Sequence, residues 1–308
     1  MNMKNCYYRL LFCGLFVVLI GTINCSAQKK SDVVYRDYTR MEAGFLDALK
    51  KDNLMASFKG IRALKEETKQ VKANTPVMVT PREAGKKKMM PREMIETRRE
   101  SVLTVNKFLR ASNTPEMVMG WAAAVVLSED GVCVSNFHVF WELLDPTAKL
   151  NPQDSLMFVA TEDGRVYQIT EILSYNREGD MAFFKIDTRG DKLTPMPLGD
   201  DLPAGLNVHV LSHPEGYPYA YTNGVVFRTI TLNPEDPFAR RMEVTADYAK
   251  GASGGPIMDD RGNMVSMVSS IRSIFYSNQP PYNQQMNVKL TIPVSSLRRL
   301  MQSQPKDK

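Results

Sequence analysis

A glycine-rich segment in the last quarter of the chain contains the side chain best suited to nucleophilic catalysis. Residues 251–256 read Gly-Ala-Ser-Gly-Gly-Pro, which places Ser253 on a turn with no bulky neighbour. Acyl transfer needs such a turn, because the serine oxygen must reach a carbonyl carbon while backbone N–H groups point at the developing oxyanion. Glycines permit the required dihedrals and leave room for a substrate. Taken alone, the segment is equally typical of an ordinary loop, since Gly and Ser are common in turns.

Two further residues turn this segment into a catalytic pattern. His138 follows a strand-like segment and opens into a helical loop, and Asp180 directly precedes another strand-like segment. The order His, Asp, Ser is that of double-barrel serine proteases, and it differs from the order in α/β-hydrolases and subtilisins. The chain also lacks the strand–helix alternation of an α/β-hydrolase. The other histidines, His209 and His213, are expected to be structural, since neither has further ligands at the spacing of a metal site.

The elements that must position these residues are short β-strands, which begin at about residue 117. Turn signals such as Asp130-Gly131 and Asp163-Gly164 separate the strands, and no helices intervene. This pattern indicates antiparallel barrels or sandwiches in two halves that meet near Pro195 and Pro197. The predicted strands are 122–127, 132–135, 155–160, 166–173, 181–186, 207–212, 224–231, 242–245, 256–258, 264–269 and 289–293.

Four segments between residues 117 and 302, in the same order, resemble the trypsin-like (chymotrypsin-fold) serine proteases, most closely the protease domain of the HtrA/DegP type. They are a strand, turn and histidine segment, an aspartate strand, the start of a second barrel with a His-Pro-x-Gly turn, and the serine loop; these cover 120–139, 180–186, 198–226 and 251–262. The resemblance implies a mainly β fold with two antiparallel barrels, at about 117–196 and 197–302, preceded by an α-helical N-terminal extension. No PDZ-like segment is recognised after the protease region.

The resemblance also implies a role for each residue of the pattern. Ser253 is the expected nucleophile, His138 the general base and later the acid, and Asp180 the group that holds the imidazole tautomer. The backbone N–H groups of Gly251 and Ser253 are expected to form the oxyanion hole. No cofactor and no metal are expected. One departure from the family is Phe137, where a small residue usually precedes the histidine.

The substrate pocket is predicted from two positions near the serine. Asp247 lies six residues before Ser253, where trypsin-like enzymes that cleave after Lys or Arg keep an acid. A loop-bracing role for Asp247 is the default interpretation, because buried acids are usually paired or hydrogen-bonded. Met267, Val268 and Ser269 are expected to form a pocket wall that favours apolar or small side chains.

The N-terminus has the pattern of a signal peptide over residues 1–27. Basic residues precede an apolar run at 10–23, which is short for a membrane span, and the small residues of Cys25-Ser26-Ala27 suit cleavage. An uncleaved anchor and lipidation of Cys25 are the alternatives. Export would make the protein periplasmic or secreted. Because Cys133 alone lies outside this region, a disulfide scaffold and a thiolate zinc cluster are excluded, and Cys133 is expected in the core.

The region between the leader and the strands is predicted to be helical and then extended. Apolar residues at helical spacing indicate an amphipathic extension within 28–75, which starts near Ser31 and Asp32 and either docks on the domain or mediates self-association. Residues 76–116 are predicted to hold an exposed, flexible linker from Pro76 to Pro91 and a helix from Arg92 to Leu109. Residues 303–308 form a polar tail.

Composition and charge restrict the classes of function. The chain of 308 residues is 43% apolar with a net charge of +5, or +3 without residues 1–27, which argues against a nucleic-acid partner. The sequence therefore predicts an exported serine endopeptidase acting on proteins or peptides. The alternatives are a protease-fold binding or sensing module whose site Phe137 distorts, and an enzyme kept latent by the N-terminal helices until the chain is trimmed near residues 86–88.

Overall fold

The computed structural model describes residues 33–51, 53–111 and 114–303. Contacts divide the chain into two units, residues 1–36 and 37–308. The described part of the first unit, residues 33–36, is exposed and forms neither helix nor strand. The predicted signal peptide and the predicted helix start at Ser31 and Asp32 lie outside the described residues. None of the helices in the described part of the chain is long and apolar enough to span a membrane.

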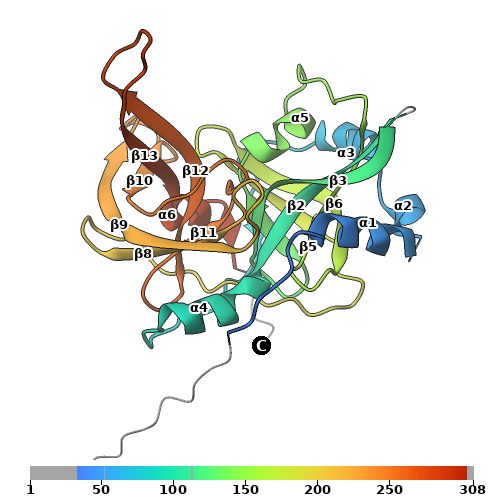
Figure 1. The fold of residues 1–308 in the computed structure, drawn as a ribbon, viewed down its shortest axis with the longest axis horizontal. Coiled ribbons are helices and arrows are strands. Elements are labelled where there is room, and N and C mark those ends of the chain that lie inside the picture. The colour runs from blue at the N-terminus through green and yellow to red at the C-terminus, as the bar shows by residue number, and fades with distance from the viewer. Residues whose placement is uncertain (1–32, 52, 112–113, 304–308) are drawn as a thin grey trace, which may run out of the picture. The chain divides into compact units, whose positions relative to one another are not determined.

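Two closed antiparallel six-stranded barrels make up most of the second unit (Figure 1), so the predicted fold class is confirmed. The first barrel has the order β2-β3-β4-β7-β6-β5 and comprises β2 (Val102–Ala111), β3 (Thr114–Val126), β4 (Val132–Ser135), β5 (Asp154–Ala160), β6 (Val166–Asn176) and β7 (Met181–Ile186). The second has the order β10-β13-β12-β11-β8-β9 and comprises β8 (Asn207–Ser212), β9 (Ala220–Thr231), β10 (Arg240–Val244), β11 (Pro256–Met258), β12 (Met264–Phe275) and β13 (Gln284–Pro293). All the strands predicted from residue 122 onward are present.

Separate apolar clusters fill the barrels and join them. Tyr167 and Phe184 belong to the core of the first barrel, together with Cys133, whose thiol has a raised pKa because it is buried. A different cluster contains Phe183 of β7 and Met267 of β12, and it therefore lies between the barrels. Full burial of such side chains contributes about 1.5–3 kcal/mol each. The two barrels are thus held in one relative position by packing.

Helices α1 (Met41–Lys51), α2 (Leu54–Ser57) and α3 (Ile61–Thr68) pack on the first barrel. Phe45 and Leu49 of α1 share a buried cluster with residues of β2 and β5. Their four-residue spacing places both on one face of the helix, as the sequence pattern indicates. Ile61 and Leu64 of α3 join the core of the first barrel. The helices are therefore docked on the domain through their apolar faces.

The prediction of an exposed linker from Pro76 to Pro91 is wrong for the first half of this segment. Val77 and Val79 are buried, and β1 (Val77–Met78) pairs in parallel with β14 (Met301–Gln302). Further along, the side-chain amide of Asn263 accepts a hydrogen bond from Gly85 N–H at 2.7 Å. Alternating apolar residues thus give this segment a buried face. The lysines at 86–88 are exposed, as expected.

The prediction of a helix from Arg92 to Leu109 is also wrong beyond the first turns of that helix. Helix α4 (Pro91–Arg98) is followed by one 3-10 turn, η1 (Arg99–Ser101), and then by β2. Residues 102–108 are buried in an unbroken run, and β2 pairs with both β3 and β5. A chain shortened to begin near residue 113 would therefore lose a strand of the first barrel.

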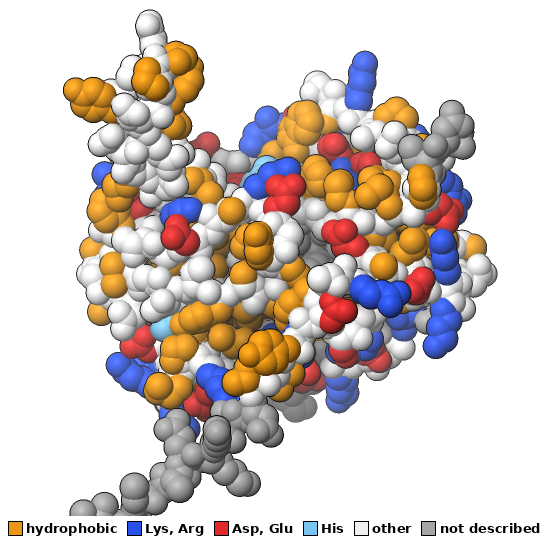
Figure 2. All heavy atoms as spheres, viewed as in Figure 1, with side chains coloured by type: hydrophobic (Ala, Val, Ile, Leu, Met, Phe, Trp, Pro, Cys, Tyr) orange, Lys and Arg blue, Asp and Glu red, His pale blue; other side chains and the backbone are white. Residues whose placement is uncertain are grey.

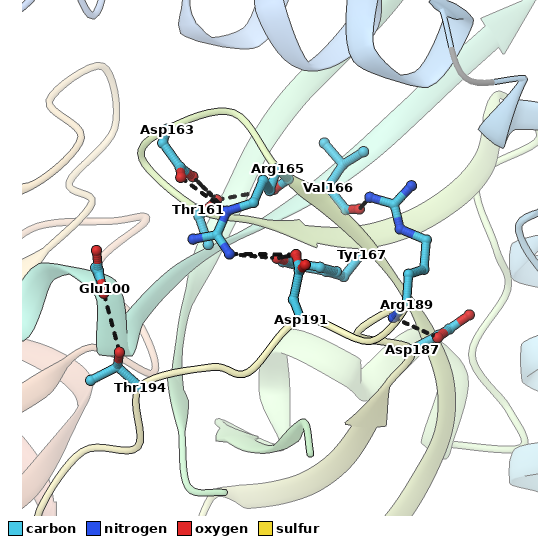
Figure 3. A network of polar contacts seen from close by, with 10 residues as sticks. All are labelled: Glu100, Thr161, Asp163, Arg165, Val166, Tyr167, Asp187, Arg189, Asp191 and Thr194. Carbon is cyan, nitrogen blue, oxygen red and sulfur yellow. Dashed lines mark hydrogen bonds and ion pairs between the residues drawn. The ribbon is translucent and has the colours of Figure 1, made fainter. Parts of the chain in front are cut away.

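A polar network ties the β5–β6 turn to the connection between the barrels (Figure 3). Arg165 donates to the Tyr167 hydroxyl at 3.0 Å, and this hydroxyl donates to Asp191 at 2.5 Å. The hydrogen bond from Tyr167 is the main reason that the pKa of Asp191 lies below its ordinary value. Thr194, in the same connection, donates to Glu100 of η1 at 3.1 Å. The network fastens the start of the inter-barrel connection to the first barrel.

The β12–β13 hairpin extends beyond the second barrel (Figure 1). From Ser270 onward, β12 pairs with β13 alone. Figure 2 shows hydrophobic side chains gathered on this projecting arm. The exposed large ones are Ile271, Ile274, Phe275, Tyr276, Tyr282 and Met286.

A buried lysine joins three parts of the first barrel. Lys107 of β2 is 3% exposed, and its Nζ lies 2.7 Å from an oxygen of the buried Asp154 and 2.6 Å from one of Glu142. The same Nζ lies 4.0 Å from the centre of the Trp121 ring. A buried charge that loses its partner destabilises a fold strongly, so Asp154 depends on this contact.

We expect Lys107→Met to lower the free energy of unfolding by about 3–5 kcal/mol, because it leaves the Asp154 carboxylate buried without its cation. Urea denaturation at pH 7 measures this. The control is Lys50→Met, since Lys50 pairs with Glu116 at an exposed site and such pairs contribute at most about 1 kcal/mol. Equal losses in the two variants would contradict the importance of the buried pair.

Candidate active site

His138 lies where β4 gives way to a helical turn. After Ser135 the chain enters η2 (His138–Phe140) and then α5 (Trp141–Leu144). The Ser135 hydroxyl donates to Ala123 O at 2.7 Å, which fixes the end of β4 against β3. The His138 side chain is about half exposed. The sequence prediction of a strand that opens into a helical loop is confirmed.

Asp180 occupies the turn between β6 and β7 in a left-handed conformation with φ of 46°. Few residues other than Gly adopt this region, although Asp and Asn do so more readily than most. Its backbone N–H donates to Arg177 O at 3.1 Å, and Asn136 Nδ2 donates to Asp180 O at 3.0 Å. Arg241 of β10 is largely buried and donates to Glu178 O at 2.5 Å. The turn is thus fixed from both barrels.

The serine loop of the second barrel is packed directly against the first. Gly254 has a φ of 84°, and a Cβ at this position would lie 2.2 Å from both Ala123 O and the Ser135 hydroxyl. Across the same contact, Ser253 O accepts a hydrogen bond from Ala123 N–H at 2.8 Å. Only glycine fits here, since the position needs both a positive φ and the absence of a side chain.

These elements bring His138, Asp180 and Ser253 into contact. His138 Nδ1 lies 3.0 Å from each oxygen of Asp180, and His138 Nε2 lies 2.8 Å from Ser253 Oγ. The backbone N–H of His138 also donates to Asp180 at 3.1 Å. A carboxylate on one ring nitrogen selects the tautomer in which the other nitrogen can accept a proton. The arrangement can deprotonate the serine hydroxyl.

Ser269 is a member of this site whose contact with Asp180 the sequence did not predict. Its hydroxyl donates to Asp180 Oδ2 at 2.5 Å across 89 positions of sequence. The sequence predicts Ser269 in a pocket wall together with Met267 and Val268, and this assignment stays a prediction. Both of these neighbours are buried in apolar clusters. Ser269 follows the serine loop along the chain, which is why the sequence places it near the site. No local sequence pattern indicates Asp180 as its partner.

Asp247 lies on the surface, and its carboxylate is 83% exposed. It is 3.4 Å from Nζ of Lys289, which also donates to Tyr248 O at 2.6 Å. Thr222 donates to Asp247 O at 2.5 Å. These contacts brace the loop before Ser253. The assignment of Asp247 to a substrate pocket stays a prediction.

Gly251 and Ser253 carry the two backbone N–H groups predicted to form the oxyanion hole. Gly251 has a φ of 91°, and a Cβ there would lie 2.6 Å from His213 O. Within the described part of the chain, neither N–H donates a hydrogen bond to another backbone group. Their role as the oxyanion hole stays a prediction.

Phe137 does not displace the histidine. Its ring is 5% exposed and packs in the core of the first barrel, 5.5 Å from the ring of Tyr175 and 5.1 Å from the Arg177 guanidinium. The His138 contacts described above are maintained beside it. The bulk of Phe137 is thus accommodated by the barrel, away from Ser253.

A cavity of about 520 Å³ opens beside the serine and histidine. Its lining includes Ser253, His138 and Gly251 on one side and residues of α1 and β3 on the others. Trp121 of β3 lines it and donates through its indole N–H to Val139 O at 3.2 Å. Asp247 and residues 267–269 are not part of this lining. No sequence pattern indicates this cavity, because its walls are far apart along the chain.

The other histidines lie in buried polar contacts. His213 is buried, and its Nδ1 accepts a hydrogen bond from Tyr219 N–H at 3.0 Å. This burial lowers the pKa of His213 from 6.5 to about 3, so the ring is neutral. His209 lies between the Tyr221 hydroxyl and Asp260, at 2.8 and 3.1 Å. Among the residues that the structure describes, no group of three or more His, Cys, Asp or Glu side chains could hold a metal ion.

Comparison with known proteins agrees with this fold. Residues 122–267 match the family model of the trypsin-like peptidase domain. The chain is 28% identical over 155 residues to Protease Do-like 5, chloroplastic, of Arabidopsis thaliana, a match that covers 49% of this chain and 48% of the relative. It is 27% identical over 148 residues to a probable periplasmic serine endoprotease DegP-like of Halomonas elongata, covering 47% and 28% of the two. Over about half of its length the chain is therefore similar to trypsin-like proteases of the HtrA type.

Solved structures give the same fold. The HtrA-type protease AlgW with decapeptide superposes with a TM-score of 0.53 at 19% identity, covering 69% of this chain and 66% of that one. The crystal structure of Deg5 gives a TM-score of 0.51 at 21% identity, covering 67% and 89%. The chain spans less than half the length of the first curated relatives that it matches.

We expect Gly254→Ala to be more destabilising than Gly190→Ala by at least about 2 kcal/mol of unfolding free energy. Both glycines have a φ between 80° and 90°, but a Cβ at Gly190 meets nothing within 4 Å, whereas one at Gly254 meets Ala123 O. The Gly190 variant therefore measures backbone strain alone, about 1 kcal/mol. Urea denaturation measures both variants. Equal losses would show that the two barrels do not press together at Gly254.

The buried His213 predicts a pH dependence of stability. Because its pKa is lowered in the folded state, the neutral ring stabilises the fold above pH 6.5, and this stability is lost as the pH falls toward about 3. We expect the free energy of unfolding to fall more steeply with decreasing pH in the native protein than in His213→Gln, by up to about 1.4 kcal/mol per pH unit. Denaturant melts between pH 7 and 4.5 measure both slopes. Parallel slopes would mean that His213 is not buried as a neutral ring.

Proposed function

We propose that this protein is an exported serine endopeptidase that hydrolyses peptide bonds through an acyl-enzyme. The contact of Ser253 Oγ with His138 Nε2 at 2.8 Å, with Asp180 on the other ring nitrogen, carries the proposal. The matched family supports a protease. A further support is that a solved structure of the HtrA-type protease AlgW contains a decapeptide.

Each residue of the site has one task in the proposed reaction. Ser253 Oγ attacks the carbonyl carbon while its proton passes to His138 Nε2, and Asp180 stabilises the resulting imidazolium. The N–H groups of Gly251 and Ser253 stabilise the oxyanion. Collapse of the tetrahedral intermediate breaks the C–N bond, and His138 gives its proton to the leaving amine. Water then attacks the acyl-enzyme, loses a proton to His138, and the serine hydroxyl is restored.

Export is the second part of the proposal. It rests on the basic start, apolar run and small residues of the segment 1–27. The names of the relatives are in keeping with it, since they include periplasmic DegP-like proteases and chloroplastic ones. Edman sequencing of the protein from a bacterial periplasm, with a new N-terminus near Gln28, would support cleavage of this segment.

We expect the native protein to react with a fluorophosphonate probe and Ser253→Ala to lose both this labelling and peptide hydrolysis. The control is Ser277→Ala, since Ser277 lies on the exposed β12–β13 hairpin and should leave labelling intact. Gel fluorescence after probe treatment measures the reaction. Equal labelling of Ser253→Ala would overturn the assignment of the nucleophile, and a native protein that never reacts would favour a binding or sensing role.

A further inference from the structure

The cavity beside Ser253 is closed on one side by the N-terminal part of the chain. Its lining combines His138 and Gly251 of the active site with Tyr38, Met41 and Phe45. Figure 1 shows α1 lying alongside the strands of the first barrel. Residues before the trypsin-like domain thus form part of the surface that a substrate meets.

This wall is fixed to the barrel by several contacts. Glu42 of α1 accepts a hydrogen bond from Gly120 N–H of β3 at 2.8 Å. Phe45 and Leu49 are buried beneath the helix. The ring of Tyr38 stacks at 6.2 Å on that of Tyr219. Because α1 is held by packing and by a hydrogen bond, the cavity is preformed.

The surface of the cavity is mainly apolar, although Thr39, Thr104 and Asn106 also line it. The large apolar side chains of the lining are Tyr38, Met41, Phe45, Met119, Trp121 and Val139.

The carboxylates and the lysine of the lining each have an ion-pair or hydrogen-bond partner. Lys250 and Glu215 pair with each other at 3.4 Å, and both are exposed at the rim. Glu42 bonds to the backbone of β3. A preformed apolar cavity of this kind favours a large apolar side chain over a charged one.

The position of the cavity relative to the nucleophile decides which part of a substrate enters it. In the proposed reaction His138 protonates the leaving amine, so the chain that follows the scissile bond must lie on the His138 side of Ser253. Both His138 and Val139 line the cavity, whereas Asp247 and residues 267–269 do not.

We propose that this cavity binds a large apolar side chain, aromatic or long aliphatic, from one of the first two residues after the scissile bond, and that α1 and β3 thereby set specificity. This inference rests on the proposed peptidase function. A side chain of the leaving segment gains binding energy when it buries apolar surface in the cavity. Differences of one to a few apolar groups in a fitted pocket change kcat/KM by about 10–200-fold.

The experiment compares matched quenched fluorescent peptides that differ only at these two positions. Phe or Leu at the favoured position should raise kcat/KM about tenfold or more over Ala, and still more over Glu. Sequencing the cleavage products of unfolded proteins should show the same enrichment after the scissile bond. Equal cleavage of all the peptides would overturn the inference.

A pair of variants on β3 tests the wall itself. Met119→Ala should reduce the preference for Phe over Ala by about threefold, because Met119 lines the cavity. The matched control is Met117→Ala, since Met117 lies two residues away on the same strand, is 48% exposed and is not part of the lining. An unchanged preference in Met119→Ala would contradict the assignment.

Fluorophosphonate labelling of the native protein tests the peptidase function separately from the preference of the cavity. If the native protein does not react, the proposed peptidase function is wrong and this inference fails with it. If it reacts and cleaves peptides but shows no preference after the scissile bond, the function stands and only the inference is wrong.

Discussion

The active site depends on one contact between the two barrels. The serine loop presses on β3 so closely that Gly254 has no room for a side chain, and Ser253 O is hydrogen-bonded to Ala123 N–H. His138 and Asp180 belong to the first barrel and Ser253 to the second, so their distances are a property of this interface. The hydrogen bond from Ser269 to Asp180 crosses the same interface. A shift of one barrel by about 1 Å would break the alignment that proton transfer requires.

Apolar packing supplies the force that maintains this contact. The cluster that contains Phe183 and Met267 lies between the barrels, and the strands that carry it lead directly to the site. β7 begins one residue after Asp180, and β12 contains Ser269. The same strands therefore bury the core and position the polar groups, which leaves the site little freedom to adopt a second geometry.

The sequence predicted the parts of the fold whose signals are local. The order of His138, Asp180 and Ser253, together with strand and turn patterns from residue 122 onward, led to two barrels and to the residues that lie in contact. β2 was missed because it is buried without a break from 102 to 108 and thus lacks the alternation of a half-exposed strand. The contact between Ser269 and Asp180 and the cavity wall were missed because the residues involved are distant in sequence, and residue patterns do not report such contacts.

A crystal structure of the protein after reaction with a peptidyl phosphonate is the strongest test of Ser253 as the nucleophile and of the two N–H groups as the oxyanion hole. The account predicts a covalent bond from phosphorus to Ser253 Oγ, with a phosphoryl oxygen within about 2.7–3.1 Å of the N–H groups of Gly251 and Ser253. His138 should remain between this adduct and Asp180. A bond to any other residue would contradict the role of Ser253 as the nucleophile. A phosphoryl oxygen that points away from both N–H groups would contradict the proposed oxyanion hole.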